Sequence, residues 1–208
     1  MADTLVLLVE GKNDRYVLEH LFAHHKIPNA ISIKECSGVD NLFERLPVQL
    51  KSSGLQRLGV VLDANASLAS RWEALRGIFS NAGYSSMPAQ PEIFGTVLVE
   101  QDRPKLGIWL MPNNTLPGML EDFVQYLVPN DDTLWKLAEE ALQKIPKEEQ
   151  RFIDAHRIKA HIHTWLAWQE QPGTPMGLAI TKRYLDAQAP SAQQFIAWIR
   201  RLFLDDEL

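Results

Sequence analysis

The chain has 208 residues, of which 46% are hydrophobic and 23% charged, and its formal net charge is -5 at pH 7. This composition is typical of a globular protein, and the apolar runs are far shorter than the ~20 residues of a membrane-spanning helix. A single cysteine, Cys36, excludes an internal disulfide and a zinc site built from cysteine pairs, so we expect a cytoplasmic protein with no membrane partner.

The first part of the chain alternates short apolar runs with amphipathic segments. Buried strands are predicted at residues 4–9, 30–36 and 58–62, and helices at residues 14–25, 39–51 and 67–81. The strands are continuously apolar rather than alternating. This pattern favours an α/β fold in which a mostly parallel sheet is covered by helices on both faces.

Two further strands are predicted at residues 93–100 and 105–111, and the turn between them indicates a hairpin that makes the sheet mixed. A helix is expected over residues 116–127. Beyond Pro129 the pattern is helical only, with helices predicted at residues 131–145, 148–169, 175–188 and 191–204. We therefore predict an α/β domain over residues 1–129, followed by a helical C-terminal extension over residues 130–208 that packs on it.

Acidic residues end two of the predicted strands. Glu10 follows the first strand and Asp63 follows the third. Taken alone, each is explained as the polar end of a buried strand. Ligands of open α/β sheets bind at the carboxyl ends of the strands, and Mg²⁺ prefers oxygen ligands on rigid elements, so the pair predicts a divalent-cation site.

The two strand ends resemble the motifs of the TOPRIM domain, a metal-binding α/β module of topoisomerases, bacterial primases and OLD-type nucleases. The first motif is Leu-Leu-Val-Glu-Gly-Lys-Asn-Asp at residues 7–14, and the second is Val-Val-Leu-Asp-Ala-Asn at residues 60–65. The resemblance covers about residues 4–127 and implies a TOPRIM-like sheet. Segments 107–123 and 159–168 resemble a small prokaryotic family related to TOPRIM, which carries no established substrate.

The TOPRIM resemblance implies a set of site residues. Glu10 and Asp63 would be catalytic, and the ligands of a Mg²⁺ or Mn²⁺ cofactor would be Glu10, Asp63, Asn65 and Glu121. Asp14 and Asp122 would be auxiliary, and Lys12 would contact a phosphate. TOPRIM enzymes carry an aspartate where this chain has Asn65, which offers a carbonyl oxygen but removes one negative charge.

The resemblance implies divalent-metal-dependent hydrolysis of phosphodiesters in nucleic acid. The acidic net charge does not favour nonspecific binding of nucleic acid, although basic residues outnumber acidic ones within residues 147–204. A metal held by the carboxylates would offset this repulsion. Whether the chain is an enzyme stays open, because the missing aspartate at position 65 is also expected of a degenerate site.

Two alternatives remain at this point. The first is a noncatalytic TOPRIM-like module that binds a protein partner or a second copy of the chain. Carboxylates that are spread apart, or plugged by a lysine or arginine, would favour it. The second is a phosphatase-like phosphotransferase, because residues 60–67 faintly resemble the haloacid-dehalogenase motif in which Asp63 would attack the phosphoryl group. That alternative leaves Glu10 unexplained.

Overall fold

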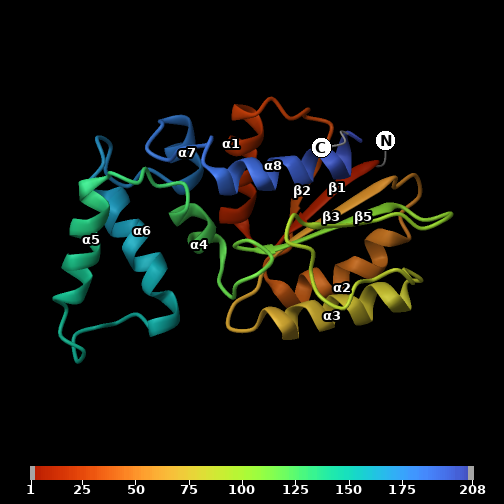
Figure 1. Ribbon diagram of the computed structural model, residues 1–208, viewed down its shortest axis with the longest axis horizontal. Coiled ribbons are helices and arrows are strands. Elements are labelled where there is room, and N and C mark those ends of the chain that lie inside the picture. Colours follow the sequence, from red (N-terminus) through yellow and green to blue (C-terminus); the bar gives the residue numbers. More distant parts are fainter. Residues whose placement is uncertain (1–2, 206–208) are drawn as a thin grey trace.

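The computed structural model describes residues 3–205 and has an α/β architecture with one five-stranded sheet (Figure 1). The strands are β1 (Leu5–Val9), β2 (Ser32–Glu35), β3 (Arg57–Asp63), β4 (Thr96–Leu98) and β5 (Lys105–Met111), in the spatial order β2-β1-β3-β5-β4. All neighbours are parallel except β4, which pairs antiparallel with β5. The predicted mostly parallel sheet is therefore confirmed, with the hairpin at its edge.

Helices cover both faces of the sheet. One face packs against α2 (Val39–Leu50) and α3 (Leu68–Asn81), which lie below the sheet in Figure 1. The other packs against α1 (Lys12–His24) and α8 (Pro190–Phe203). The strand residues alternate between the two cores: Val6 and Leu8 face the first, and Leu7 and Val9 the second. Within residues 3–205, no helix combines the length and the apolar character needed to cross a bilayer.

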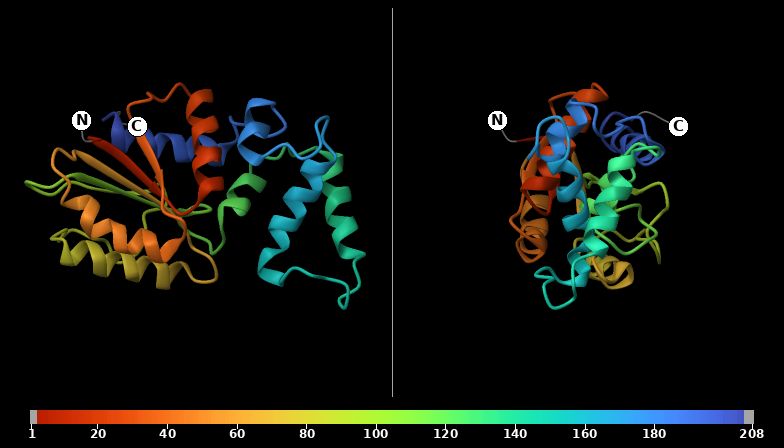
Figure 2. Two further views of the ribbon diagram at one scale, coloured as in Figure 1. Left: turned by 180° about the vertical axis from the view of Figure 1, so that it is seen from behind. Right: turned by 90° about the vertical axis from the view of Figure 1, so that its left-hand side faces the viewer.

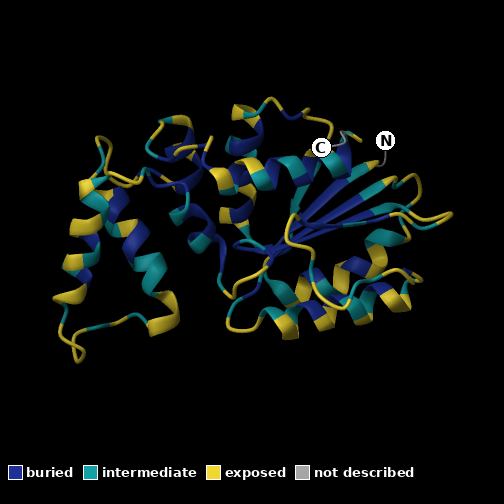
Figure 3. Ribbon diagram, in the orientation of Figure 1, coloured by how far each residue is buried: buried dark blue, intermediate teal, exposed yellow. Residues whose placement is uncertain are grey.

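The helices beyond residue 130 share a core with the sheet. Buried residues of α7 (Met176–Thr181) and α8 belong to the same hydrophobic cluster as the α1 face of the strands, and α7 packs against α1. The helices α5 (Thr133–Gln143) and α6 (Arg157–Ala167) also contribute buried residues to this cluster, and they form a helical hairpin that projects from the sheet (Figures 1 and 2). Figure 3 shows its buried residues on the facing sides of the two helices.

Several helices are shorter than the sequence pattern predicts. The helix expected over residues 148–169 begins with irregular backbone and a 3₁₀ turn at Asp154–His156, and only α6 is α-helical. Ile153 is 62% exposed, so this segment buries little apolar surface that would stabilise a helix. The helix expected over residues 175–188 is replaced by the shorter α7, and Arg183 just beyond it adopts a left-handed conformation with φ of 61°.

The helix expected over residues 116–127 is reduced to α4 (Leu120–Gln125). Gly118, with φ of 144°, lies before it in a bridge to Asn65, so the chain there follows the edge of the sheet. The strand expected over residues 93–100 is likewise reduced to β4. A turn at Gly95, whose φ is 84°, directly precedes β4.

We predict that Gly107→Ala destabilises the protein by about 1–3 kcal/mol, because overpacking a well-filled core costs about that much. Gly107 lies on β5 beneath α8, and a methyl group there would clash with the side chain of Leu202. Urea denaturation measures the change. Gly77→Ala, at an exposed position of α3 where nothing lies within 4 Å of the added methyl group, should instead stabilise the protein by about 0.5–1 kcal/mol. Equal stability of Gly107→Ala and wild type would contradict close packing of α8 on the sheet.

Candidate functional site

Four carboxylates converge at the carboxyl edge of the sheet. Glu10 and Asp63 follow neighbouring parallel strands whose register pairs Val9 with Val61, so the two strand ends lie side by side. Asp14 comes from the first turn of α1 and Glu121 from α4. All four residues line one open pocket of about 450 Å³.

Two hydrogen bonds hold the acidic residues in place. Asp14 Oδ2 accepts a hydrogen bond from the backbone N–H of Gly11 at 3.1 Å, which caps the start of α1. Asp63 Oδ1 accepts one from the N–H of Leu120 at 2.9 Å. This contact joins the end of β3 to the first residue of α4, and the next residue of that helix is Glu121. Each bond uses one carboxylate oxygen and leaves the other available.

Three buried carboxylate oxygens in this pocket have no hydrogen-bond partner: Glu10 Oε2, Asp14 Oδ1 and Glu121 Oε2. Asp14 is 6% exposed and Glu121 is 2% exposed. Burying a polar group without a partner costs free energy, and native proteins rarely do so. The pocket therefore offers oxygen ligands that nothing within residues 3–205 satisfies.

Burial and mutual repulsion shift the pKa values of these groups upward. Burial raises the pKa of Asp63 to about 8, and the charges of Asp14, Glu10 and Glu121 add to the shift. Burial likewise raises the pKa of Asp14 to about 7, with further contributions from Glu10 and Glu121. The pKa of Glu10 is also raised, mainly by burial. The carboxyl groups of the cluster are therefore not all ionised at neutral pH, and a bound cation would stabilise their ionised forms.

A lysine from the helical hairpin also lines the pocket. Lys159 Nζ, on α6, lies 2.6 Å from Glu121 Oε1, and the lysine side chain is 38% exposed. Its charge also lowers the pKa of Glu10, opposing the effect of burial. Sequence reasoning did not assign Lys159 to the site, because it is 38 residues from Glu121 and on another helix. Nothing in its local pattern distinguishes it from a solvated lysine.

Between residues 3 and 205, we find no group of three or more His, Cys, Asp or Glu side chains that lie close enough together to hold a metal ion without moving. The carboxylates share a pocket without closing around a single point. Binding of a cation would therefore require movements of the side chains in the pocket.

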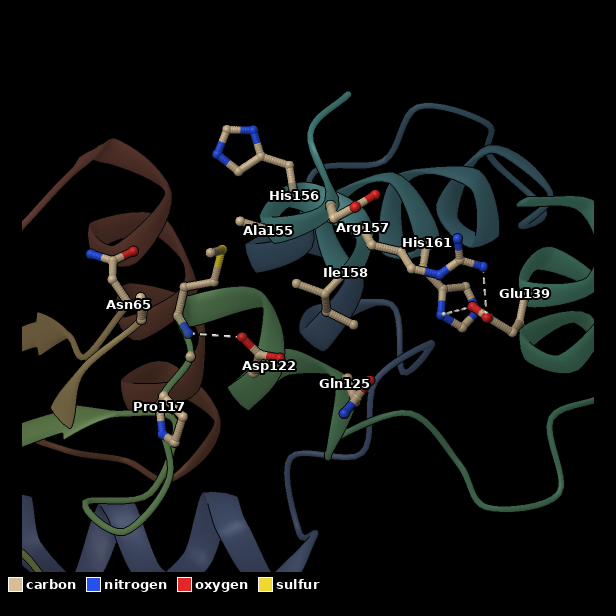
Figure 4. Close-up of a pocket in the computed structure, with 14 residues that line it drawn as sticks. Asn65, Pro117, Asp122, Gln125, Glu139, Ala155, His156, Arg157, Ile158 and His161 are labelled. Atoms are coloured by element: carbon tan, nitrogen blue, oxygen red, sulfur yellow. Dashed lines mark hydrogen bonds and ion pairs between the residues drawn. The ribbon is translucent and has the colours of Figure 1, made fainter. Parts of the chain in front are cut away.

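The remaining predicted site residues divide between two pockets. Lys12 lines the carboxylate pocket. Asn65 and Asp122 line a neighbouring pocket of about 670 Å³ (Figure 4). Asn65 is left-handed, with φ of 52°, and its backbone N–H donates to the carbonyl oxygen of Gly118 at 2.6 Å. Asp122 Oδ2 accepts from the N–H of Met119 at 2.8 Å. The structure thus brings Asp14 into the cluster and places Asn65 and Asp122 beside it.

The neighbouring pocket lies between the sheet and the helical hairpin. Figure 4 shows Asn65 and Asp122 on one side of it and Arg157, His161 and Glu139 on the other. An ion pair of 2.9 Å joins Arg157 to Glu139. The two pockets adjoin across α4 and α6, whose successive residues line one or the other. A ligand held at the carboxylates could therefore extend toward the hairpin.

A family model described as "Protein of unknown function (DUF3226)" matches residues 4–204. No curated protein and no solved structure matches the chain. The match includes both the strands that carry the carboxylates and the helix that carries Lys159. The pocket therefore lies wholly within the matched region.

We predict that the metal-free protein loses stability as the pH rises between the ordinary aspartate pKa of 3.8 and the raised value of about 8, because folded Asp63 retains a proton that the unfolded chain has already released. Asp63→Asn removes this titration and keeps the oxygen that accepts from Leu120. At the higher pH its Tm should exceed that of wild type by about 3 °C or more, given ~2–4 °C per kcal/mol for this chain length. Thermal unfolding with a chelator present measures both. A wild-type Tm that does not change with pH would contradict the strained cluster.

Proposed function

We propose that this chain, which belongs to the DUF3226 family, binds Mg²⁺ or Mn²⁺ at the carboxylate pocket and hydrolyses phosphodiester bonds of nucleic acid. The observation that carries the proposal is the set of three buried carboxylate oxygens without partners in one pocket. Hard divalent cations take such oxygens as ligands, with water completing the shell. Binding of a cation would reduce the electrostatic repulsion among the carboxylates of the pocket.

The positions of the residues suggest their roles. Glu10 and Asp63, on the ends of rigid strands, would be the main ligands, and Asp14 and Glu121 would complete the set. A bound divalent cation supplies Lewis-acid chemistry and favours deprotonation of water. Glu10 would act either as a ligand or as the base that accepts a proton from the attacking water. Lys12, an exposed residue that lines the pocket, would contact a phosphate.

The TOPRIM resemblance agrees with this arrangement and forms part of the proposal. Its two motifs lie on adjacent parallel strands, and both acidic residues reach the same pocket. Asn65 does not line that pocket, so the proposal does not use it as a ligand. Asp14, from the end of the first motif, supplies a carboxylate that the second motif lacks.

We expect Glu10→Gln and Asp63→Asn each to weaken Mn²⁺ binding by more than about tenfold, since even indirect support of a metal commonly contributes 10–100-fold. Both substitutions keep the side-chain shape. Calorimetric titration or electron paramagnetic resonance of free Mn²⁺ measures the affinity.

Asn65→Gly is the matched comparison for this titration, because glycine adopts the left-handed backbone of this position without strain and keeps the bridge to Gly118. Asn65 lines the neighbouring pocket and supplies no carboxylate oxygen, so this variant should keep the affinity within about twofold of wild type. A large loss in Asn65→Gly with none in Glu10→Gln would contradict the proposed ligand set.

We also expect the wild-type protein to cleave single- or double-stranded DNA or RNA in the presence of Mg²⁺ or Mn²⁺, and Glu10→Gln to lose at least about a hundredfold of the rate, as is typical of a lost acid–base group. Gel electrophoresis of end-labelled substrates measures cleavage. Equal cleavage by Glu10→Gln would reveal a contaminating nuclease, and a metal-loaded wild-type protein that cleaves none of these substrates would contradict the hydrolytic proposal.

The ion pair between Lys159 and Glu121 favours a second candidate, a noncatalytic module that binds a partner through the same fold. In this case Lys159 would be the permanent counter-ion of the pocket, and no exogenous cation would enter. The metal titration separates the two candidates. Binding of Mn²⁺ that depends on Glu10 supports the metal site, whereas no binding at millimolar Mn²⁺ supports the partner-binding module.

A further inference from the structure

We infer that Lys159 is an internal competitor for the cation site: its ammonium group holds Glu121 in the metal-free protein, and a divalent cation binds by displacing it. This inference rests on the proposed function, because it assumes that the carboxylate pocket takes a divalent cation. It adds a residue that sets the affinity of the pocket for a divalent cation.

The contact between Lys159 and Glu121 is asymmetric. Glu121 is 2% exposed, whereas Lys159 is 38% exposed. The carboxylate is therefore fixed in the pocket, while the lysine reaches it from solvent on a long, flexible side chain. Lysine bonds as a single point charge, so it uses Oε1 and leaves Oε2 without a partner. The ammonium therefore satisfies the pocket only in part.

The remaining carboxylates favour a cation of higher charge. Glu10 and Asp14 each keep a buried oxygen without a partner, and Lys159 makes its ion pair with Glu121. A divalent cation brings twice the charge of the ammonium and accepts several oxygens at once. It would draw these oxygens and Glu121 together, and the like charges of cation and ammonium would then repel each other.

The position of the hairpin would allow Lys159 to move away from the carboxylate pocket. Lys159 lies on α6, and the hairpin of α5 and α6 projects from the sheet, as Figures 1 and 2 show. Beside it on α6, Arg157 is paired with Glu139 of α5 within the hairpin and not with the carboxylate pocket. Loss of the pair to Glu121 would therefore release a contact between the hairpin and α4 while leaving the pairing inside the hairpin intact.

The affinity of the pocket for Mn²⁺ tests this inference. Lys159→Met keeps the approximate length of the side chain and removes its charge. It should tighten Mn²⁺ binding by about tenfold or more, because an ammonium group within the same pocket repels the bound cation. Lys159→Gln should tighten binding in the same direction. The matched control is Arg157→Met, which removes another paired cation of α6 outside the pocket and should leave the affinity unchanged. Circular dichroism checks that each variant is folded.

The outcomes separate the two levels of the proposal. Tighter binding in both Lys159 variants than in wild type supports the competition. Binding that appears only in the variants overturns displacement in the wild-type protein, because Lys159 would then be a permanent counter-ion. Equal affinities in wild type and both variants overturn it while leaving the metal site in place. Weaker binding in the variants also overturns it, because Lys159 would then support Glu121 instead of competing for it. No Mn²⁺ binding in wild type or in either variant overturns both the competition and the metal site.

Chemical labelling gives a second readout that depends neither on activity nor on a substitution at Lys159. Adding Mg²⁺ should raise the rate at which acetic anhydride acetylates Lys159 by severalfold, as measured by mass spectrometry of tryptic peptides. Lys147, which is paired with Asp154 at 2.6 Å on the same hairpin, is the internal control and should not change. The Mg²⁺ effect should disappear in Glu10→Gln. Unchanged labelling of Lys159 at a Mg²⁺ concentration that saturates the pocket would overturn the inference.

Discussion

The hydrogen bond from the N–H of Leu120 to Asp63 Oδ1 links the sheet to the rest of the candidate site. It ties the end of β3 to the beginning of α4, and the adjacent backbone bridge between Asn65 and Gly118 secures the same junction. Because α4 begins there, Glu121 is carried into the pocket that Glu10 and Asp14 already line. Without this junction, the pocket would hold only Glu10, Asp14 and Asp63.

The junction concentrates acidic groups in a way that costs stability. Asp14 and Asp63 both have pKa values well above those of free carboxyl groups, and burial is the main cause of each shift. Structural carboxylates usually lie where a salt bridge or several N–H groups lower their pKa. Carboxylates whose pKa values are raised together are characteristic of functional sites, where a bound ligand supplies the countercharge that the protein lacks. The fold can bear the cost because two hydrophobic cores, one on each face of the sheet, support the strands.

The helical hairpin of α5 and α6 lines both pockets. Through Lys159 it contacts the carboxylate pocket, and through Arg157 and His161 it forms a wall of the neighbouring one. His161 stacks on Trp135 of α5 with 3.6 Å between ring centres, so the two helices of the hairpin are packed directly against each other. The two pockets are thus both lined by residues of α6, including the charged side chains of Lys159 and Arg157. Any ligand that spans them would contact the sheet and the hairpin together.

Local sequence determined the parts of this protein that depend on neighbouring residues. Continuous apolar runs predicted the strands, and the acidic residues directly after two of them predicted Glu10 and Asp63 at one edge, because parallel strands end together. Tertiary structure decided the rest. Lys159 reaches Glu121 from a distant helix, the exposed segment before α6 does not continue as a helix, and the left-handed backbone of Asn65 places its side chain in a different pocket. These features depend on how separate elements pack and on which polar groups that packing buries, and neither is encoded in the spacing of residues along the chain.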